Sequence, residues 1–179
     1  MQPIPIRTDS VMTSAIPRLE TDRLILREIS IADWPEYRSM LMSERAIHMD
    51  GPYSLAGAWG MFCADTAQWS LFGVGALMID EKSTGLCVGQ VGINHGPLFP
   101  EHELGWLLYQ DAEGRGIATE AAIAMRAWAF GVRKLTTLVS YIAPDNHGSI
   151  GLAIRLGAVL DHDAQRPDPE DLVFRHQAP

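Results

Sequence analysis

The junction between an apolar stretch and a helix at residues 106–120 places the strongest constraint on how this chain can fold. The apolar stretch ends at Tyr109, and a short loop with Gly114 and Gly116 leads directly into an alanine-rich run that predicts a helix over residues 114–130. The first N–H groups of a helix have no partner inside it, and the helix dipole adds about half a positive charge there. Glycine lets a bulky anion approach the main chain. The segment therefore predicts a strand, a turn and a helix, and the turn is compatible with either a pyrophosphate site or simple chain reversal.

Two common nucleotide-binding motifs do not fit this junction. The dinucleotide-binding fingerprint requires a third glycine at the position that Thr119 occupies. A G-x-x-x-x-G-K-[ST] loop, which would hold the phosphates of ATP, does not occur in the chain. NAD and ATP are therefore disfavoured as ligands, although another phosphate-bearing molecule remains compatible with the junction.

Composition limits the classes of partner. The chain has 179 residues, the size of one ordinary domain, and its formal net charge of -8 argues against a long nucleic-acid footprint. Its longest apolar runs are far shorter than the roughly 20 residues that span a bilayer, and the N-terminus has no secretory pattern. The two cysteines form no CxxC pair. We therefore expect a cytoplasmic protein with no nucleic-acid partner, no membrane partner and no metal.

Local patterns predict the remaining elements, with a flexible arm over residues 1–17 and a single domain over residues 18–179. Asp33 and Ser54 each stand before a predicted helix as suitable N-cap residues. The mixed order of strands and helices indicates the α+β class. The predicted strands are 23–29, 73–80, 85–94, 102–109, 135–142, 159–163 and 171–176; the predicted helices are 34 to about 42, one that begins at 54 and includes 69, 114–130, and 146–156.

Several motifs occur in an order that resembles the GNAT N-acetyltransferases. The sequence ELGW at residues 103–106 precedes the glycine junction, which is similar to the family motif Q/R-x-x-G-x-G/A, although Asp111 stands where Gln or Arg is usual. Residues 21–27 resemble the opening strand of the RimJ/RimL branch, which acetylates protein N-termini. Residues 146–149, with Leu and Gly at 156–157, resemble its late helix. The resemblance covers residues 18–177.

This resemblance implies a fold and a reaction. The GNAT fold has a mixed, mostly antiparallel central sheet, here of about six or seven strands, flanked by about four helices. The implied reaction moves an acetyl group from acetyl-CoA to a primary amine, directly and within a ternary complex. The RimJ/RimL resemblance favours a protein N-terminal α-amine as the acceptor. A small-molecule amine and a non-catalytic CoA-binding module remain alternatives, and the protein could be a monomer or a homodimer.

The resemblance also assigns residues to acetyl-CoA. Main-chain groups on the strand before the junction would pair with the pantetheine arm, and an N–H group near its end would donate to the developing oxyanion. Amides at the junction would bind the pyrophosphate, and Asn146 would bind the pantetheine chain near the thiol. The cofactor-binding residues are Leu107, Leu108, Tyr109, Gly114, Arg115, Gly116, Ile117, Ala118, Thr119 and Asn146.

Two residues are catalytic candidates on the same grounds. Glu103 would accept a proton from the amine, and the alternative is a half-exposed strand carboxylate in an ion pair. Ser149 would protonate the leaving thiolate, and the alternative is a small residue that fits near a helix start. The tyrosine acid of many family members is absent, because its position is Ala153.

The acceptor pocket is the least informative part of the sequence. Four aromatic or imidazole side chains are candidates, although ordinary packing is the favoured interpretation for each of them. His102 is next to Glu103 but should face the other side of the strand. The four acceptor candidates are Trp34, Tyr53, His95 and Tyr141.

Other enzyme classes fit poorly. Residues 147–151 nearly match the serine-hydrolase elbow G-x-S-x-G, but His147 replaces the first glycine and the chain lacks the alternating βαβ units of that fold. His102 and Glu103 begin an HExxH zinc motif, but Trp106 occupies its last position.

Overall fold

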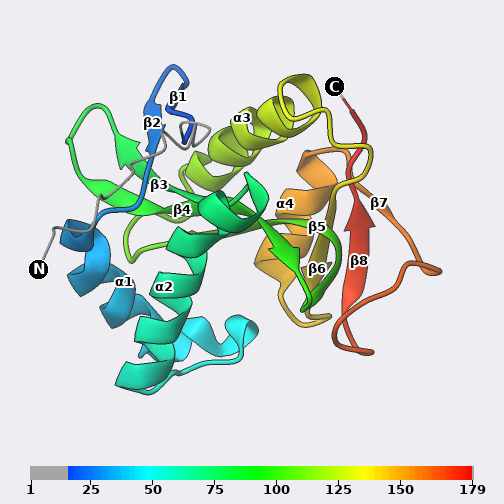
Figure 1. The fold of residues 1–179 in the computed structure, drawn as a ribbon, viewed down its shortest axis with the longest axis horizontal. Coiled ribbons are helices and arrows are strands. Elements are labelled where there is room, and N and C mark those ends of the chain that lie inside the picture. Colours follow the sequence, from blue (N-terminus) through cyan, green and yellow to red (C-terminus); the bar gives the residue numbers. More distant parts are fainter. Residues whose placement is uncertain (1–15, 179) are drawn as a thin grey trace, which may run out of the picture.

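The computed structural model describes residues 16–178. The arm predicted over residues 1–17 therefore lies outside the described residues, apart from Ile16 and Pro17. The described chain contains an eight-stranded sheet in the order β1-β2-β3-β4-β5-β6-β8-β7 (Figure 1). The strands are β1 (Leu19–Glu20), β2 (Leu24–Arg27), β3 (Ala76–Glu81), β4 (Cys87–Gly96), β5 (Phe99–Leu108), β6 (Val139–Ile142), β7 (Val159–Leu160) and β8 (Leu172–Arg175).

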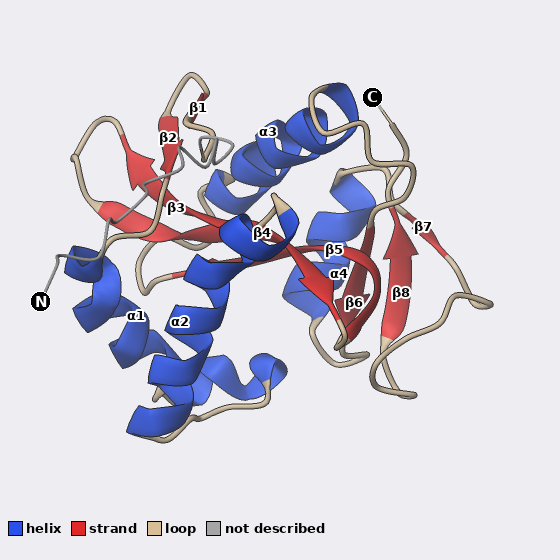
Figure 2. Ribbon diagram, viewed as in Figure 1, coloured by secondary structure: helices blue, strands red, loops and turns tan. Residues whose placement is uncertain are grey.

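Helices cover both faces of this sheet. Figure 2 shows α1 and α2 on one side and α3 and α4 on the other. One buried cluster joins α1 and α2 to the sheet through side chains such as Tyr37, Phe62 and Met78, and another joins α3 to the opposite face. The described helices are α1 (Trp34–Leu41), α2 (Leu55–Phe72), α3 (Ile117–Gly131) and α4 (His147–Arg155), with the 3-10 helices η1 (Ile31–Asp33) and η2 (Glu44–Met49).

Helix α2 shows how local chemistry sets the ends of an element. The side chain of Ser54 accepts a hydrogen bond from the Gly57 N–H at 3.1 Å, which satisfies one of the free donors of the first turn. The helix ends at Gly73, whose φ of 66° is left-handed, as is common at helix C-termini. The prediction of a helix beginning after Ser54 is confirmed.

The sheet has one place where its strands separate. β5 and β6 are the parallel neighbours, and their register contains one pair, Glu103 with Val139. Every other neighbouring pair in the described sheet is antiparallel. Beyond Glu103, β5 continues to Leu108 without pairing to β6. The mixed, mostly antiparallel sheet is thus confirmed, and we call the stretch over which β5 and β6 no longer pair the opening.

Several predicted boundaries were wrong for local reasons. β6 begins at Val139 rather than at residue 135, because Lys134 is left-handed (φ 57°) and the Leu135 N–H bonds to the carbonyl of Ala129 at the end of α3. α3 begins at Ile117 rather than at residue 114, because Gly114 and Gly116 both have left-handed backbone conformations. β5 begins earlier than predicted, because Phe99 pairs with Gly96 across a tight turn. The short strand β1 and both 3-10 helices were not predicted.

Within the described residues, no helix combines the length and the apolar character needed to cross a bilayer.

Candidate active site

The loop before α3 presents main-chain N–H groups without helical partners, and we call it the candidate anion cradle. Gly114 and Gly116 have φ values of 72° and 75°, in the left-handed region that favours glycine, so the helix cannot begin before Ile117. Gly116 is the N-cap, and no side chain caps the helix. The first intrahelical bond runs from the Glu120 N–H to the Gly116 carbonyl, so the N–H groups before it have no helical partner. Donors of this kind suit a pyrophosphate.

Three side chains of this segment are engaged within the protein. The side chains of Ile117 and Ala118 are buried in the core. The Arg115 guanidinium forms an ion pair with the buried Glu81. The main-chain carbonyl of Arg115 accepts a hydrogen bond from Arg23 at 3.0 Å. Arg23 in turn pairs with Glu120 at 2.6 Å, which holds the loop against the start of β2. The structure therefore brings the predicted residues from Gly114 to Thr119 together as backbone donors.

The end of β5 presents one residue to the opening. The Tyr109 N–H bonds to the Val88 carbonyl at 2.9 Å, so this residue uses its N–H for the ladder with β4. In an antiparallel ladder, neighbouring residues alternate between hydrogen-bonded and non-bonded pairs. Leu108, which pairs with Gly89 in the register, therefore turns its N–H and C=O away from β4, toward the opening beside β6.

Arg45 of η2 already contacts this point. Its Nη2 atom donates to the Leu108 carbonyl at 3.1 Å, and its guanidinium forms an ion pair with Glu113, directly before the cradle. From the same 3-10 helix, Nδ1 of His48 lies 3.4 Å from a carboxylate oxygen of Asp145, in the loop before α4. η2 therefore links the end of β5 to the loop that precedes α4.

Glu103 lies on β5 with its carboxylate facing α2. Its Oε2 atom accepts a hydrogen bond from Nδ2 of Asn94 at 2.6 Å. Burial raises the pKa of Glu103 to about 7, against the lowering effect of this hydrogen bond, and the carboxylates of Asp171 and Asp65 add to the rise. Gly105 leaves room beside it, because a Cβ atom there would lie 3.3 Å from Glu103 Oε1. Such a carboxyl group can accept a proton near neutral pH.

Ser149 and Asn146 lie at the start of α4. The Asn146 side chain accepts from the Ser149 N–H at 3.1 Å, so its oxygen caps the helix and its NH₂ group is the end that could donate to a ligand. The Ser149 hydroxyl accepts from the indole N–H of Trp106 at 3.2 Å. Because Trp106 and Glu103 are three residues apart on β5, their side chains lie on opposite faces of the sheet. The candidate acid and base therefore flank the opening from opposite sides.

The structure separates the four acceptor candidates. Trp34 packs edge-on against Trp59 and Phe62, between α1 and α2. The His95 ring stacks on His102 with centroids 4.1 Å apart. Because residues alternate along β4, that ring lies on the face opposite to Asn94 and Glu103.

Of the two tyrosines, Tyr141 lies near the base. The Tyr141 hydroxyl accepts from the Glu101 N–H at 3.2 Å, and its pKa is raised by burial and by the neighbouring carboxylates of Glu101 and Glu103. The Tyr53 hydroxyl donates to the Met49 carbonyl, and burial and then Asp50 raise its pKa. Packing accounts for Trp34 and His95, whereas the tyrosines remain acceptor candidates.

Sequence reasoning missed the polar side chains that face Glu103. Asn94 supplies the hydrogen bond to the base, Gln68 on α2 contacts Asn94, and Arg45 reaches Leu108. One signal was available, because Gln90 and Asn94 are polar residues on the same side of an otherwise apolar strand. Their partners on α2 could not be read from spacing.

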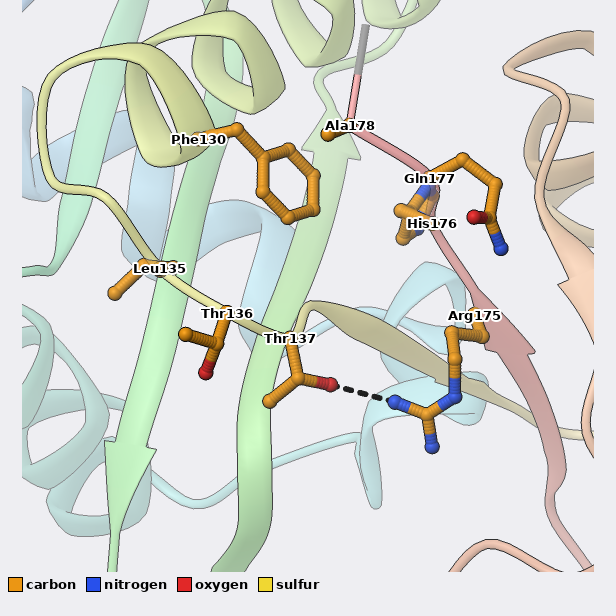
Figure 3. Close-up of a pocket in the computed structure, with 8 residues that line it drawn as sticks. All are labelled: Phe130, Leu135, Thr136, Thr137, Arg175, His176, Gln177 and Ala178. Carbon is orange, nitrogen blue, oxygen red and sulfur yellow. Dashed lines mark hydrogen bonds between the residues drawn. The ribbon is translucent and has the colours of Figure 1, made fainter.

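A separate cavity of about 310 Å³ lies between the end of α3 and β8 (Figure 3). Arg175 lines it but is held by hydrogen bonds to Thr137 and Glu101. None of the candidate site residues contributes to its lining: Phe130, Leu135, Thr136, Thr137, Arg175, His176, Gln177 and Ala178. Across residues 16–178, no group of three or more His, Cys, Asp or Glu side chains is arranged to hold a metal ion.

Comparison with known proteins assigns the family. Residues 23–159 match the family model described as an acetyltransferase (GNAT) domain. The structure is similar to the crystal structure of an acetyltransferase from Agrobacterium tumefaciens str. C58, with 54% sequence identity and a TM-score of 0.89 over 95% of this chain and 99% of that one.

Two other solved structures are more distant. A candidate GNAT-family acetyltransferase from Bordetella pertussis is 27% identical with a TM-score of 0.75, over 90% of this chain and 100% of that one. A candidate ribosomal-protein-serine acetyltransferase from Vibrio cholerae is 25% identical with a TM-score of 0.71, over 90% and 97% of the two chains. The family match covers the cradle, the opening beside β5 and the carboxylate of Glu103, and the chain belongs to the GNAT acetyltransferase family.

Proposed function

We propose that this protein transfers an acetyl group from acetyl-CoA directly to a primary amine, and that the amine is a protein N-terminal α-amine. The observation that carries this proposal is the carboxyl group of Glu103. Its pKa is raised to about 7, and it lies on β5, where the pairing with β6 ends and from which the chain leads into a helix N-terminus with no side-chain cap. A base tuned to neutral pH and an anion cradle are the two parts that this reaction requires.

The main chain would hold acetyl-CoA. The N–H groups from Gly114 to Thr119 would bind the pyrophosphate, and the C=O of Leu108 would accept from the pantetheine arm. Arg45 would have to release that carbonyl as the arm binds, since its Nη2 atom lies 3.1 Å away. The NH₂ group of Asn146 would bind the arm near the thiol. When bound, acetyl-CoA supplies the acetyl group as a reactive thioester.

Glu103 would take the proton from the acceptor amine. A free α-amine has a pKa of about 8, so at neutral pH most of it is protonated and cannot attack a carbonyl carbon. A carboxylate with a pKa of about 7 can accept that proton, directly or through water. The free-energy cost of the transfer is small, because the pKa values of the amine and the carboxyl group differ by only about one unit. The Leu108 N–H, which faces the opening, would stabilise charge that develops on the acetyl oxygen.

Ser149 would return a proton to the departing sulfur. A free thiol has a pKa of about 8.5, so a thiolate is already a tolerable leaving group and a weak donor suffices. The Trp106 indole donates to the Ser149 oxygen, which leaves the hydroxyl proton free to point elsewhere. Ala153 occupies the position of the family's tyrosine acid and is fully buried, so no tyrosine can protonate the thiolate from there.

One observation supports a protein N-terminus as the acceptor, and a second favours a cationic amine of any kind. The Vibrio cholerae structure carries a name that refers to ribosomal-protein-serine acetylation. The formal net charge of -8 favours the approach of a cationic amine through weak electrostatic steering.

The test is an acceptor profile. The full chain is incubated with acetyl-CoA and, separately, an N-terminal peptide library and a panel of small amines, and release of free thiol is recorded. We expect turnover with peptides that have a free α-amine and little with the small amines. Turnover confined to small amines would contradict the acceptor assignment, and no thiol release with any amine would contradict the proposed activity.

A further inference from the structure

A chain of three hydrogen bonds leads from the main chain of β4 through α2 to the carboxylate of Glu103. The His95 N–H donates to Oε1 of Gln68 at 2.9 Å. Nε2 of Gln68 donates to Oδ1 of Asn94 at 2.9 Å. Nδ2 of Asn94 donates to Oε2 of Glu103 at 2.6 Å. Neither Gln68 nor Asn94 has a role in the reaction proposed above.

The direction of this chain is determined at its first bond. A main-chain N–H can only donate, so the amide of Gln68 must turn its oxygen toward His95. Its NH₂ group then faces Asn94, which must accept with its oxygen. The NH₂ group of Asn94 is therefore the end that meets Glu103. Without Gln68, the Asn94 amide could rotate by about 180° at little cost and present its oxygen to the carboxyl group instead.

We propose that Gln68 is a positioning residue, which acts through Asn94 so that a hydrogen-bond donor, and not an acceptor, meets the carboxylate of Glu103. Its significance for catalysis rests on the proposed function, in which Glu103 must be ionised to accept a proton. A donor favours the ionised carboxylate, and an acceptor favours the protonated acid.

The other groups that face Glu103 do not supply this donor. Asp65 on α2 and Asp171 before β8 are carboxylates, and both disfavour ionisation of Glu103. Asp65 already accepts from the Tyr37 hydroxyl at 2.7 Å and from Gln90 at 3.0 Å. Tyr141 on β6 lies close enough for Glu103 to raise its pKa, but its hydroxyl bonds to the Glu101 N–H, and no hydrogen bond joins it to Glu103 within the described residues. Asn94 is therefore the donor that can hold the ionised form.

The test measures the titration of Glu103 itself. In full-length protein with ¹³C-labelled glutamate, the Glu103 carboxyl signal is assigned by its loss in Glu103→Gln and followed against pH. We expect Gln68→Met, which keeps the side-chain length but has no amide, to raise the Glu103 pKa by about one unit. The acid limb of the kcat/KM profile should move by the same amount, while the Kd for acetyl-CoA stays unchanged. An unmoved Glu103 titration in this variant would overturn the proposal.

A second variant guards against loss of folding. Gln68→Glu is nearly isosteric and can still accept from the His95 N–H, but its second oxygen would draw the NH₂ group of Asn94 away from Glu103. We expect a larger rise in the Glu103 pKa than in Gln68→Met. An unchanged titration in this variant would also overturn the proposal.

Gln90→Met is the matched control. Gln90 and Gln68 are both 8% exposed, and both amides lie between α2 and the sheet, but Gln90 donates to Asp65 rather than to Asn94. This variant should not raise the Glu103 pKa, because loss of the Gln90 donor favours protonation of Asp65, and a weaker Asp65 charge would lower the Glu103 pKa. A shift as large as that in Gln68→Met would mean that general loosening of the core moves Glu103, and it would overturn the specific role of Gln68.

The two readouts separate this inference from the function on which it rests. If the Glu103 titration moves in Gln68→Met but the pH–rate profile does not follow it, Gln68 positions the carboxylate and Glu103 is not the catalytic base. If neither moves, the positioning role fails while the activity proposed for the site is unaffected.

Discussion

The two halves of the candidate site are built from different parts of the polypeptide. The cradle at residues 114–119 is a continuous stretch of main chain, and the side chains of Arg115, Ile117 and Ala118 within it are paired or buried. The base is set by side chains from three separate elements, with Gln68 on α2, Asn94 on β4 and Glu103 on β5. A main-chain site should tolerate most side-chain changes but not a change of backbone conformation. A side-chain network should lose its function when a single polar atom is replaced.

The largest effect should come from the cradle. Gly116→Asp places a carboxylate and a Cβ atom at a left-handed position where the pyrophosphate would bind, so we expect saturable binding of acetyl-CoA to be lost in a calorimetric titration. Gly157→Asp is the matched control, because Gly157 has the same φ of 75° and open space around it, but lies after α4. The control should bind normally, and retained binding by Gly116→Asp would contradict the cradle.

The base should respond to a change of one atom. Glu103→Gln keeps the shape of the side chain but cannot accept a proton, so we expect kcat/KM at pH 7.5 to fall by about 10²–10³-fold with the Kd for acetyl-CoA nearly unchanged. In the unmodified protein, kcat/KM should rise with pH through about 7, because Glu103 must be ionised. That limb should be absent from the variant. Unchanged turnover would remove Glu103 from the mechanism.

The same substitution should stabilise the protein at alkaline pH. The folded-state pKa of Glu103, about 7, lies above its ordinary value of 4.5, so folded protein retains a proton that the unfolded chain releases between these values. The folded protein therefore becomes less stable, relative to its stability at low pH, as the pH rises through this window. We expect Glu103→Gln to raise the free energy of unfolding at pH 8 by on the order of 2 kcal/mol relative to its effect at pH 4. Urea denaturation at both pH values measures this difference, and equal effects would show that burial does not perturb Glu103.

The smallest effect should be at the candidate acid. Ser149→Ala removes the hydroxyl that accepts from Trp106, and we expect kcat to fall by less than about tenfold, because a thiolate leaves readily without protonation. The loss should appear only where thiolate departure limits the rate. Steady-state kinetics with acetyl-CoA measure it, and a loss as large as that of Glu103→Gln would make Ser149 an essential acid.

Prediction from sequence was most successful where the signal is local. Ser54 as an N-cap, the hairpin of β3 and β4, and the strand before α3 all follow from residues close together in the chain, and all are confirmed. The strand expected from residue 135 was wrong, because the contact of Leu135 with the end of α3 competes with strand formation. Which of the four acceptor candidates share a face could not be predicted, because the side to which Trp34 and His95 point depends on how α1, α2 and the sheet pack.

The sequence by itself determined the glycine turn, the free N–H groups of α3 and the presence of a carboxylate on β5, because turns, helix starts and strand alternation depend on neighbouring residues. Only the tertiary structure decided which residue of β5 faces the opening, since that depends on the register with β4. It also decided the ionisation of Glu103. A pKa depends on burial and on charges nearby in space, and those are supplied by Asn94, Asp65 and Asp171, which are distant in the chain.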